Sequence, residues 1–321
     1  DEILAELKRD LIKARNDAKL DQSANFRALY NYVRFGSEWV KACTLTDEQL
    51  LALDSDDLLA KLRGLNDIEH RILYYGPLSE KQLIAELDEN HRVGENLKVV
   101  EKAHYPMQPT PSDRVVLAQY DAKQIYYIQC TNLGIPFSTD NDALVALYNA
   151  YFGGGMNAIV FQEMREARAL AYSAWAELRE GTTGKDPYSY SAFIATQNDK
   201  MRSAIEAFDE IIENMPRSEA AFNLAKQQLM GNLESQRTTK EDILWAYINA
   251  REKGVDCDRD RQLYETLKSL TLDDVVALQQ EWVKNRPYNY VILGDRNDID
   301  MEYLKTLGPV EIVSQETIFG Y

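Results

Sequence analysis

The sequence predicts an α+β protein with two tandem sandwich units, in which an antiparallel or mixed sheet is packed by long helices. Two observations support this prediction. In the second half of the chain, strand-like segments come first and helical segments follow, without a run of alternating strand and helix units. A helical pattern near the N-terminus also recurs near the C-terminus. The chain has 321 residues, 45% of them hydrophobic, and can bury one large core or two moderate ones.

The internal repeat is clearest around Thr46 and Thr271, which lie 225 positions apart. Each threonine follows a leucine and precedes an apolar helical stretch. Upstream, Lys13 lies near the counterpart of Lys226. This match indicates two related units in tandem.

The repeat extends further along the chain. Residues 29–32 resemble residues 244–247, and residues 71–76 resemble residues 290–294. We expect the last two segments to be buried strands that end in glycine. The first unit has no counterpart of the strand pattern at 114–133. We therefore expect that unit to be incomplete and the chain to be part of a longer polypeptide.

Three prolines within residues 106–111 mark a linker, because proline favours extended backbone in itself and in the preceding residue. The predicted division is a helical back half of the first unit at 1–94, a linker at 95–112 and a complete domain at 113–321. The strands expected in that domain are 114–120, 124–132, 171–179 and 187–195. The helices expected there are 140–151, 158–168, 200–214 and one that begins at Ser218.

The most informative local feature is a glycine-rich corner at residues 152–157. Its three glycines permit a tight turn, and Asn157 is a favourable cap for the helix that follows. No Gly-Lys-Ser/Thr follows the glycines, so we prefer a turn to a phosphate-binding loop. Beyond Arg168 the pattern changes from helical to alternating, which predicts a strand. Arg165 and Tyr172 therefore flank a corner between helix and strand.

Residues 152–178, FGGGMNAIVFQEMREARALAYSAWAEL, resemble the C-terminal-half signature of the insulinase/pitrilysin family of zinc peptidases. In that clamshell family, the N-terminal half carries His-x-x-Glu-His and a further Glu on zinc, and the C-terminal half lends an Arg and a Tyr to the same site. The resemblance implies metallopeptidase-like units here, and it implies that Arg165 and Tyr172 are these catalytic residues. It also implies that both bind the substrate, together with Ser173.

These residue types suit peptide hydrolysis, which passes through a tetrahedral species with a developing negative charge on oxygen. A phenol or guanidinium directed at that oxygen stabilises the transition state more than the ground state. Tyr172 can donate one hydrogen bond, and Arg165 offers a forked set of donors. Ala169 departs from the glycine usual in the family. If its φ is positive, alanine costs about 1 kcal/mol there.

Other patterns favour structural roles or leave two interpretations open. Glu163 and Glu166 flank Arg165 and fit a solvated helix face better than an acid/base pair. Tyr188 and Tyr190 alternate as strand residues do, so they either line a substrate surface or pack within the sheet.

The composition excludes several classes of partner. With 36 basic and 52 acidic residues, the formal net charge of −16 argues against a nucleic-acid or anionic-membrane surface. No apolar run approaches the roughly 20 residues that a membrane-spanning helix needs. The first residues lack the basic start of a signal peptide.

Metal-ligand patterns are also missing from the sequence. The three histidines, His70, His91 and His104, form no i, i+4 pair. The three cysteines, Cys43, Cys130 and Cys257, form no Cys-x-x-Cys, and we expect them to be buried thiols or fillers. We therefore expect no cofactor in this chain. By resemblance, zinc belongs to the N-terminal half of the parent protein.

The predicted function is that of the C-terminal, non-zinc-binding part of a zinc metalloendopeptidase, inactive alone. The expected partners are the N-terminal zinc-binding half, in the same polypeptide or as a separate subunit, and an enclosed peptide that adds its backbone to the strand at 171–177. One alternative is a catalytically inactive partner or scaffold subunit of the same fold. Another is a helical interaction module, in which Arg165 and Tyr172 would lie on unrelated surfaces. The resemblance favours a periplasmic location.

Overall fold

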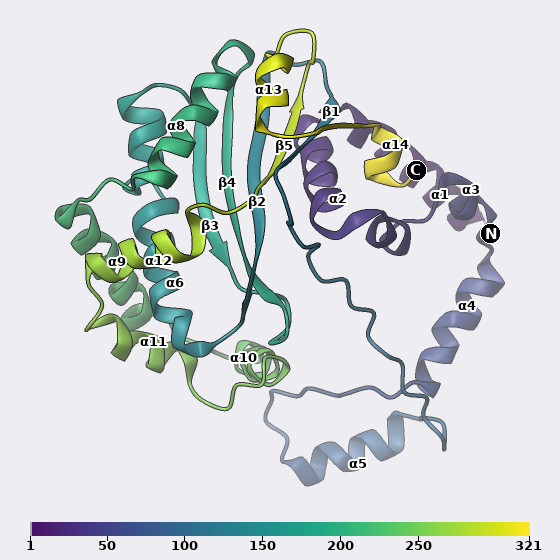
Figure 1. Ribbon diagram of the computed structural model, residues 1–321. Coiled ribbons are helices and arrows are strands. Elements are labelled where there is room, and N and C mark those ends of the chain that lie inside the picture. The colour runs from purple at the N-terminus through teal and green to yellow at the C-terminus, as the bar shows by residue number, and fades with distance from the viewer. Residues whose placement is uncertain (1) are drawn as a thin grey trace.

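A single six-stranded mixed sheet forms the centre of the computed structural model, which describes residues 2–321 (Figure 1). Its spatial order is β3-β4-β2-β5-β1-β6. The strands are β1 (Arg114–Gln119), β2 (Gln124–Pro136), β3 (Ser173–Arg179), β4 (Pro187–Gln197), β5 (Asn289–Gly294) and β6 (Val310–Val313). Neighbours from β3 to β5 are antiparallel, whereas β1 runs parallel to β5 and β6. The sheet is therefore mixed, and the α+β prediction is confirmed.

Helices cover both faces of the sheet. The larger layer contains α6 (Asp142–Tyr148), α7 (Ile159–Phe161), α8 (Met201–Glu213), α9 (Glu219–Ser235), α11 (Arg259–Leu267), α12 (Leu272–Leu278) and α13 (Met301–Leu307). The opposite face carries α2 (Gln22–Cys43) and α14 (Gln315–Phe319). The remaining α-helices are α1 (Glu2–Leu20), α3 (Asp47–Ala52), α4 (Ser55–Gly64), α5 (Glu80–Asn90) and α10 (Glu241–Glu252). Short 3₁₀ turns are η1 (Leu65–Asp67), η2 (Thr139–Asn141) and η5 (Asn198–Lys200).

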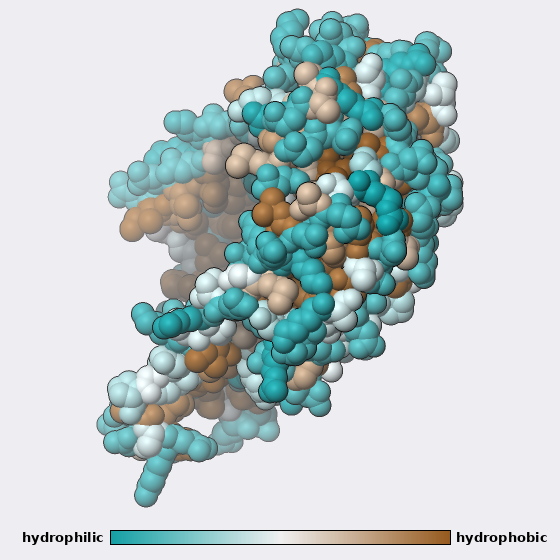
Figure 2. All heavy atoms as spheres, turned by 90° about the vertical axis from the view of Figure 1, so that its left-hand side faces the viewer, coloured by the Kyte–Doolittle hydropathy of each residue, from teal (hydrophilic) through white to brown (hydrophobic). Residues whose placement is uncertain are grey.

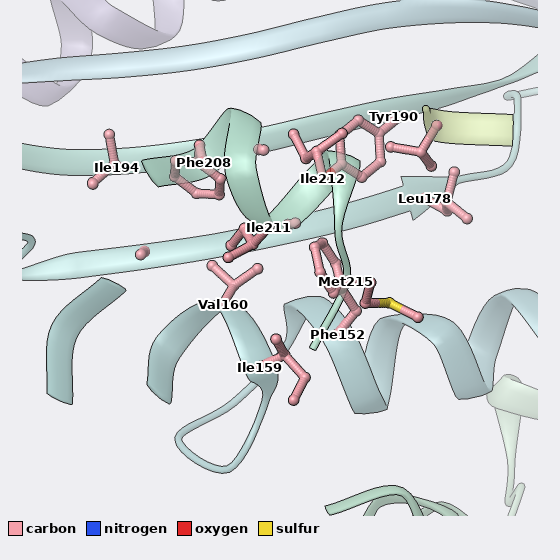
Figure 3. Close-up of a cluster of buried hydrophobic side chains, with 14 of the residues drawn as sticks. Phe152, Ile159, Val160, Leu178, Tyr190, Ile194, Phe208, Ile211, Ile212 and Met215 are labelled. Carbon is pink, nitrogen blue, oxygen red and sulfur yellow. The ribbon is translucent and has the colours of Figure 1, made fainter. Parts of the chain in front are cut away.

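The main core lies between the sheet and the larger helical layer (Figure 3). On α8, apolar residues recur at helical spacing and all of them are buried, as predicted: Ala204, Ile205, Phe208, Ile211 and Ile212. Full burial of each large side chain stabilises the fold by roughly 1.5–3 kcal/mol. Tyr188 and Tyr190 are also buried in this core, at 1% and 0% exposure, so sheet packing explains them and a substrate surface does not.

A second core lies on the other face of the sheet. Phe26, Leu29 and Val33 of α2 pack on the face of the sheet opposite the larger layer. The C-terminal helix α14 lies beside α2, and the Tyr321 ring lies 4.4 Å from the Arg15 guanidinium carbon. N-terminal and C-terminal segments therefore share one face of the sheet (Figure 1). The division at 1–94, 95–112 and 113–321 remains a prediction.

The internal repeat has a matching pair of helix starts. Thr46 caps α3 and Thr271 caps α12, each through a reciprocal capping box. Arg15 donates a 2.8 Å hydrogen bond to the Leu45 carbonyl, and Lys226 donates one of 2.8 Å to the Leu270 carbonyl. Arg15 thus makes the contact that corresponds to that of Lys226. Lys13 lies two positions from Arg15, so it is near the counterpart of Lys226, as expected, but is not the counterpart itself.

The predicted strand at 71–76 was also wrong. This stretch is irregular, and Ile72 and Tyr75 are 45% and 58% exposed. A strand forms only where its backbone groups have a neighbour, and within residues 2–321 no strand lies beside this stretch. Its repeat partner became β5 because β2 and β1 flank it on both sides.

One of the three cysteines is a buried thiol, and the other two are not. Cys130 is buried between α2 and the sheet, and this burial raises the pKa of its thiol to about 12. Cys43 and Cys257 are exposed. They lie near helix ends, where the sequence alone gives little information on burial.

The outward face of the larger helical layer is predominantly hydrophilic, with apolar residues in scattered groups (Figure 2). Within residues 2–321, none of the helices combines the length and the apolar character required to cross a membrane.

Candidate functional site

The glycine-rich corner packs directly against the edge strand β3. It begins in the last two residues of η3 (Asn149–Gly153), a π-helical turn. A Cβ atom on Gly153 would lie 1.7 Å from the Ala176 carbonyl oxygen, so only glycine permits this approach. Gly155 has φ +94° and turns the chain towards the next helix. The tight turn expected from the glycines is confirmed.

The helix after this turn begins one residue later than predicted. Ala158 is its N-cap residue and makes no side-chain capping bond, so the assignment of Asn157 as the cap was wrong. After a single turn of α7, the chain continues as η4 (Gln162–Ala167), which is π-helical and contains Arg165. Such turns are rare and occur frequently at functional sites, because the extra residue re-aims the side chains.

The corner between helix and strand has a strained residue at its centre. Ala169 adopts φ +50°, the left-handed region that favours glycine. Adjacent hydrogen bonds hold it there: the Leu170 amide donates to the Met164 carbonyl at 2.9 Å, and the Thr196 hydroxyl donates to the Leu170 carbonyl at 2.5 Å. Lys200 Nζ donates to the Ala169 carbonyl at 3.2 Å. The surrounding structure therefore imposes the positive φ on alanine.

This corner brings Arg165 and Tyr172 together. The Arg165 guanidinium carbon lies 5.5 Å from the centroid of the Tyr172 ring, within the range of a cation–π contact. Both side chains reach solvent, with Tyr172 73% and the Arg165 side chain 44% exposed. The nearest carboxylate to Arg165 is that of Glu166, at 3.8 Å from Nε. Both side chains thus retain free hydrogen-bonding capacity.

Ser173 begins β3 and pairs with Ala195 of β4. The Tyr172 amide donates to the Ala195 carbonyl at 3.0 Å. Strand alternation places Ser173 on the opposite face of the sheet from Ala174, which is buried in the main core. Since β3 is an outermost strand, the backbone groups on its outer side have no strand partner.

Glu163 and Glu166 do not form an acid/base pair. Glu163 lies 3.5 Å from Nε of Arg168, and Arg168 also pairs with Glu210 of α8 at 2.6 Å. The hydrogen bond from Arg168 lowers the pKa of the Glu210 carboxyl. This ion-pair cluster fastens η4 to α8, which supports a structural role for Glu163.

Sequence reasoning missed one residue of the site. The Phe161 ring lies 5.0 Å from the Arg165 guanidinium carbon, so the cation contacts the rings of both Phe161 and Tyr172. Phe161 lies within the helix predicted at 158–168, and apolar spacing alone does not distinguish it from the core residues of that helix. Its i, i+4 relation to Arg165 is the signal that could have identified it.

The structure also juxtaposes two histidines that are distant in sequence. His70 Nε2 and His91 Nε2 lie 2.7 Å apart, and His70 Nδ1 lies 2.7 Å from the Ile68 carbonyl oxygen. No third ligand joins them, because residues 2–321 contain no group of three His, Cys, Asp or Glu side chains placed to hold a metal ion. A structural or catalytic zinc site needs at least three protein ligands, so these residues do not fit one.

Comparison with known proteins decides the family. Residues 71–229 match the profile described as the Peptidase M16 inactive domain. The chain belongs to the M16 peptidase family. This is the insulinase/pitrilysin family of zinc peptidases, so the resemblance of residues 152–178 is confirmed.

Relatives of this M16 chain include an uncharacterized zinc protease of Mycobacterium tuberculosis and its counterpart in Mycobacterium bovis, each 26% identical over 193 residues. These matches cover 57% of this chain and 41% of each relative, less than half of their length. The fold is shared with a peptidase M16 inactive domain of Pseudomonas fluorescens (TM-score 0.67, 15% identity, 92% of this chain and 70% of that one). It is also shared with the periplasmic protease PqqL of Escherichia coli (TM-score 0.66, 16% identity, 92% of this chain and 33% of that one).

Proposed function

We propose that this M16 chain is the non-zinc-binding, C-terminal part of a zinc metalloendopeptidase, and that Arg165 and Tyr172 act on the peptide at a composite site. One observation carries the proposal. The two side chains are adjacent, exposed and directed out of a corner that backbone hydrogen bonds hold in place. A helical interaction module has no need to bring these two residues together, so the geometry favours the peptidase interpretation.

In this proposal, the Tyr172 hydroxyl donates a hydrogen bond to the oxygen on which negative charge develops during hydrolysis. Such a donor acts mainly in the transition state and typically contributes a factor of about 10²–10³ to turnover. The Arg165 guanidinium donates to backbone carbonyls of the peptide on either side of the cleaved bond. Its contacts with Phe161 and Tyr172 fix its direction before the peptide arrives, which lowers the entropic cost of binding.

We further propose that the peptide extends the sheet along the outer side of β3, next to Ser173. The position of β3 at the edge of the sheet supports the idea, since extended peptides bind readily to such edges. Only the Ser173 end is offered to the peptide, because the Leu178 amide and carbonyl already pair with the Asn149 side chain at 2.8 Å each. Zinc and its ligands belong to another segment in this proposal, the N-terminal half of the parent protein, because residues 2–321 offer no fitting ligand set. The peptide is then enclosed between the two halves. The chain alone should not cleave peptides, and the periplasmic location suggested by the resemblance remains a prediction.

The experiment is a Tyr172→Phe substitution in the complete protein, with steady-state cleavage of an unstructured peptide as the readout. We expect turnover to fall at least about tenfold while the melting temperature stays unchanged. Tyr247→Phe is the matched control, because Tyr247 is 61% exposed on α10 and lies outside the site. Wild-type turnover in Tyr172→Phe would remove this residue from the mechanism.

A second candidate function is that of a catalytically inactive partner or scaffold subunit. The matched profile is described as an inactive domain, and this description supports the second candidate. The two candidates differ in the rest of the parent protein. A His-x-x-Glu-His motif there, with one zinc per complete protein by metal analysis, supports the peptidase, and its absence supports the scaffold. One equivalent of zinc on residues 1–321 alone would contradict the composite site.

A further inference from the structure

A small pocket lies at the other end of β3 from Tyr172. Its volume is about 250 Å³, and its walls come from α2, the irregular segment at 105–107 and the connection between β3 and β4. The seven residues of β3 separate it from Tyr172 by roughly 23 Å at about 3.3 Å per residue. It is therefore distinct from the proposed composite site.

Arg34 of α2 is the unusual residue in this pocket. Its guanidinium carbon lies 5.0 Å from the Tyr30 ring and 4.7 Å from the Phe35 ring, and these aromatic contacts hold the side chain in position. Its Nε is fully buried and has no hydrogen-bond partner among residues 2–321. No carboxylate among residues 2–321 lies within ion-pair distance of the Arg34 guanidinium. A buried charged donor without a partner is costly, and in a native protein it calls for an explanation.

The other charged groups of the pocket wall already have partners. Arg179 pairs with Glu177 through two nitrogen–oxygen contacts of 2.8 and 3.3 Å. Glu180 pairs with Arg259 at 2.8 Å and with Lys253. Burial by itself would raise the pKa of the Glu180 carboxyl. The hydrogen bonds and charges of Arg259 and Lys253 outweigh burial, so the pKa is lowered. The charge that remains uncompensated in the wall is therefore that of Arg34.

Asp186, the other carboxylate of the wall, is engaged as well. Its Oδ1 lies 2.8 Å from His104 Nε2, and its Oδ2 accepts hydrogen bonds from the amide and the hydroxyl of Thr183 at 2.9 and 3.0 Å. These contacts hold Asp186 in the connection between β3 and β4. It cannot neutralise Arg34 without losing them.

We propose that this pocket binds one carboxylate group of a peptide, an acidic side chain or a C-terminus, through the Arg34 guanidinium. A planar carboxylate accepts two parallel hydrogen bonds from the guanidinium fork. One uncompensated positive charge matches a single negative charge, and the neighbouring Glu180 and Asp186 disfavour a dianion such as phosphate. The remaining walls include Phe35, Pro106 and Met107, which suit the aliphatic part of an amino-acid residue. The volume is below the roughly 300–1,000 Å³ of pockets for drug-sized ligands, which also favours a single side chain or terminus.

The test is an NMR titration of residues 1–321 labelled with ¹⁵N, with the Arg34 Nε–H resonance as the direct readout. Two probe peptides separate the sources of the carboxylate: a hexapeptide with one central glutamate and both ends blocked, and a hexapeptide without acidic side chains but with a free C-terminus. A fully blocked hexapeptide with glutamine in place of glutamate is the negative control. We expect one of the first two peptides to shift the resonance in a saturable way, and the blocked glutamine peptide to have no effect.

The matched variants are Arg34→Gln, Arg34→Lys and Arg27→Gln. Arg27 is exposed two helical turns earlier on α2, so Arg27→Gln removes the same charge from the same helix. We expect Arg34→Gln to weaken binding at least about tenfold and Arg27→Gln to change it less than about twofold, measured by calorimetry. Arg34→Lys keeps the charge but loses the fork, so an intermediate loss supports the proposal even if Arg34→Gln folds poorly.

Three outcomes would overturn the assignment. These are binding by Arg34→Gln within about twofold of wild type, no saturable shift with either carboxylate peptide up to roughly 5 mM, and tighter binding of inorganic phosphate than of both peptides. None of these measurements involves peptide cleavage. A negative result at the Arg34 pocket therefore does not bear on the proposed composite site. A negative result with Tyr172→Phe likewise does not bear on the Arg34 pocket.

Discussion

The Arg165 guanidinium carbon lies 5.5 Å from the centroid of the Tyr172 ring, although a helix end and a strained turn separate the two residues in sequence. Phe161 contacts the same cation at 5.0 Å. Each contact is worth about 0.5–1 kcal/mol at an exposed site. The helix that carries Arg165 and the strand that follows Tyr172 are thereby linked through one side chain.

Phe161→Leu should loosen Arg165 without removing it. The guanidinium would lose one of its two rings, so we expect peptide cleavage by the complete protein to fall about two- to fivefold, mainly through KM. Steady-state kinetics on the variant measures this effect. Phe137→Leu is the control, because Phe137 contacts a different arginine, Arg259, at 5.2 Å. Equal kinetics in the Phe161 variant and wild type would mean that this ring does not position Arg165.

Ala169→Gly should stabilise the fold. Alanine at φ +50° is strained, and glycine relieves that strain at a smaller entropic cost, for an expected gain of about 0.5–1 kcal/mol in the free energy of unfolding. Ala167→Gly, two residues earlier and within the helical turn η4, should have the opposite sign and a similar size. Urea unfolding of both variants provides the comparison. A destabilised Ala169→Gly variant would show that the left-handed backbone carries no strain.

Gly153→Ala should be strongly destabilising. Its Cβ would lie 1.7 Å from the Ala176 carbonyl oxygen, so the backbone of η3 or β3 must move, at an expected cost of about 2–3 kcal/mol. Gly231→Ala is the control, because a Cβ there meets no atom within 4 Å and α9 favours alanine by about 0.5–1 kcal/mol. Thermal unfolding should separate the two variants clearly. A wild-type melting temperature for Gly153→Ala would contradict the close approach.

Asp209→Asn should change how stability depends on pH. Burial is the main cause that raises the pKa of the Asp209 carboxyl from 3.8 to about 6. The folded state therefore binds this proton more tightly than the unfolded state, and the stability present below pH 4 is lost as pH rises through 6. The difference corresponds to at most about 3 kcal/mol. We expect Asp209→Asn to be about 1–2 kcal/mol more stable than wild type at pH 8.

The gain in Asp209→Asn should shrink towards zero as the pH is lowered to 4, where wild-type Asp209 is protonated in the folded state. Urea unfolding at several pH values measures the difference. Asp10→Asn is the control, because Asp10 is exposed on α1. A pH-independent difference between Asp209→Asn and wild type would rule out titration of this carboxyl as its cause.

Much of the fold was predictable because its signals are local. Alternation identified β1, β2, β3 and β4, and helical spacing identified α8 and α9, all within a few residues of their ends. The corner around Ala169 was predictable for the same reason. The motif at 152–178 places a helix end, a turn and a strand start within ten residues. Alanine was expected to be strained at position 169 if its φ were positive, and φ is +50°. The family resemblance rested on the same contiguous stretch, residues 152–178.

Contacts between distant segments were beyond local patterns. Residues 71–76 carry a strand-like pattern, but a strand also needs a neighbour, and none lies beside them in the part of the chain that the structure describes. Phe161 and the Arg34 pocket escaped notice because their significance depends on which rings and charges surround a cation.

The sequence by itself determined strands β1 to β4, the start of α9, helix α8, the family motif and the turn at Ala169, since each depends on neighbours a few residues apart. Only the tertiary structure decided that α2 and α14 share one face of the sheet, that Arg165 contacts two rings, and that Arg34 has no carboxylate partner among residues 2–321. The physical reason is that burial and charge compensation depend on distances in space. Those distances are set when the sheet brings remote segments together.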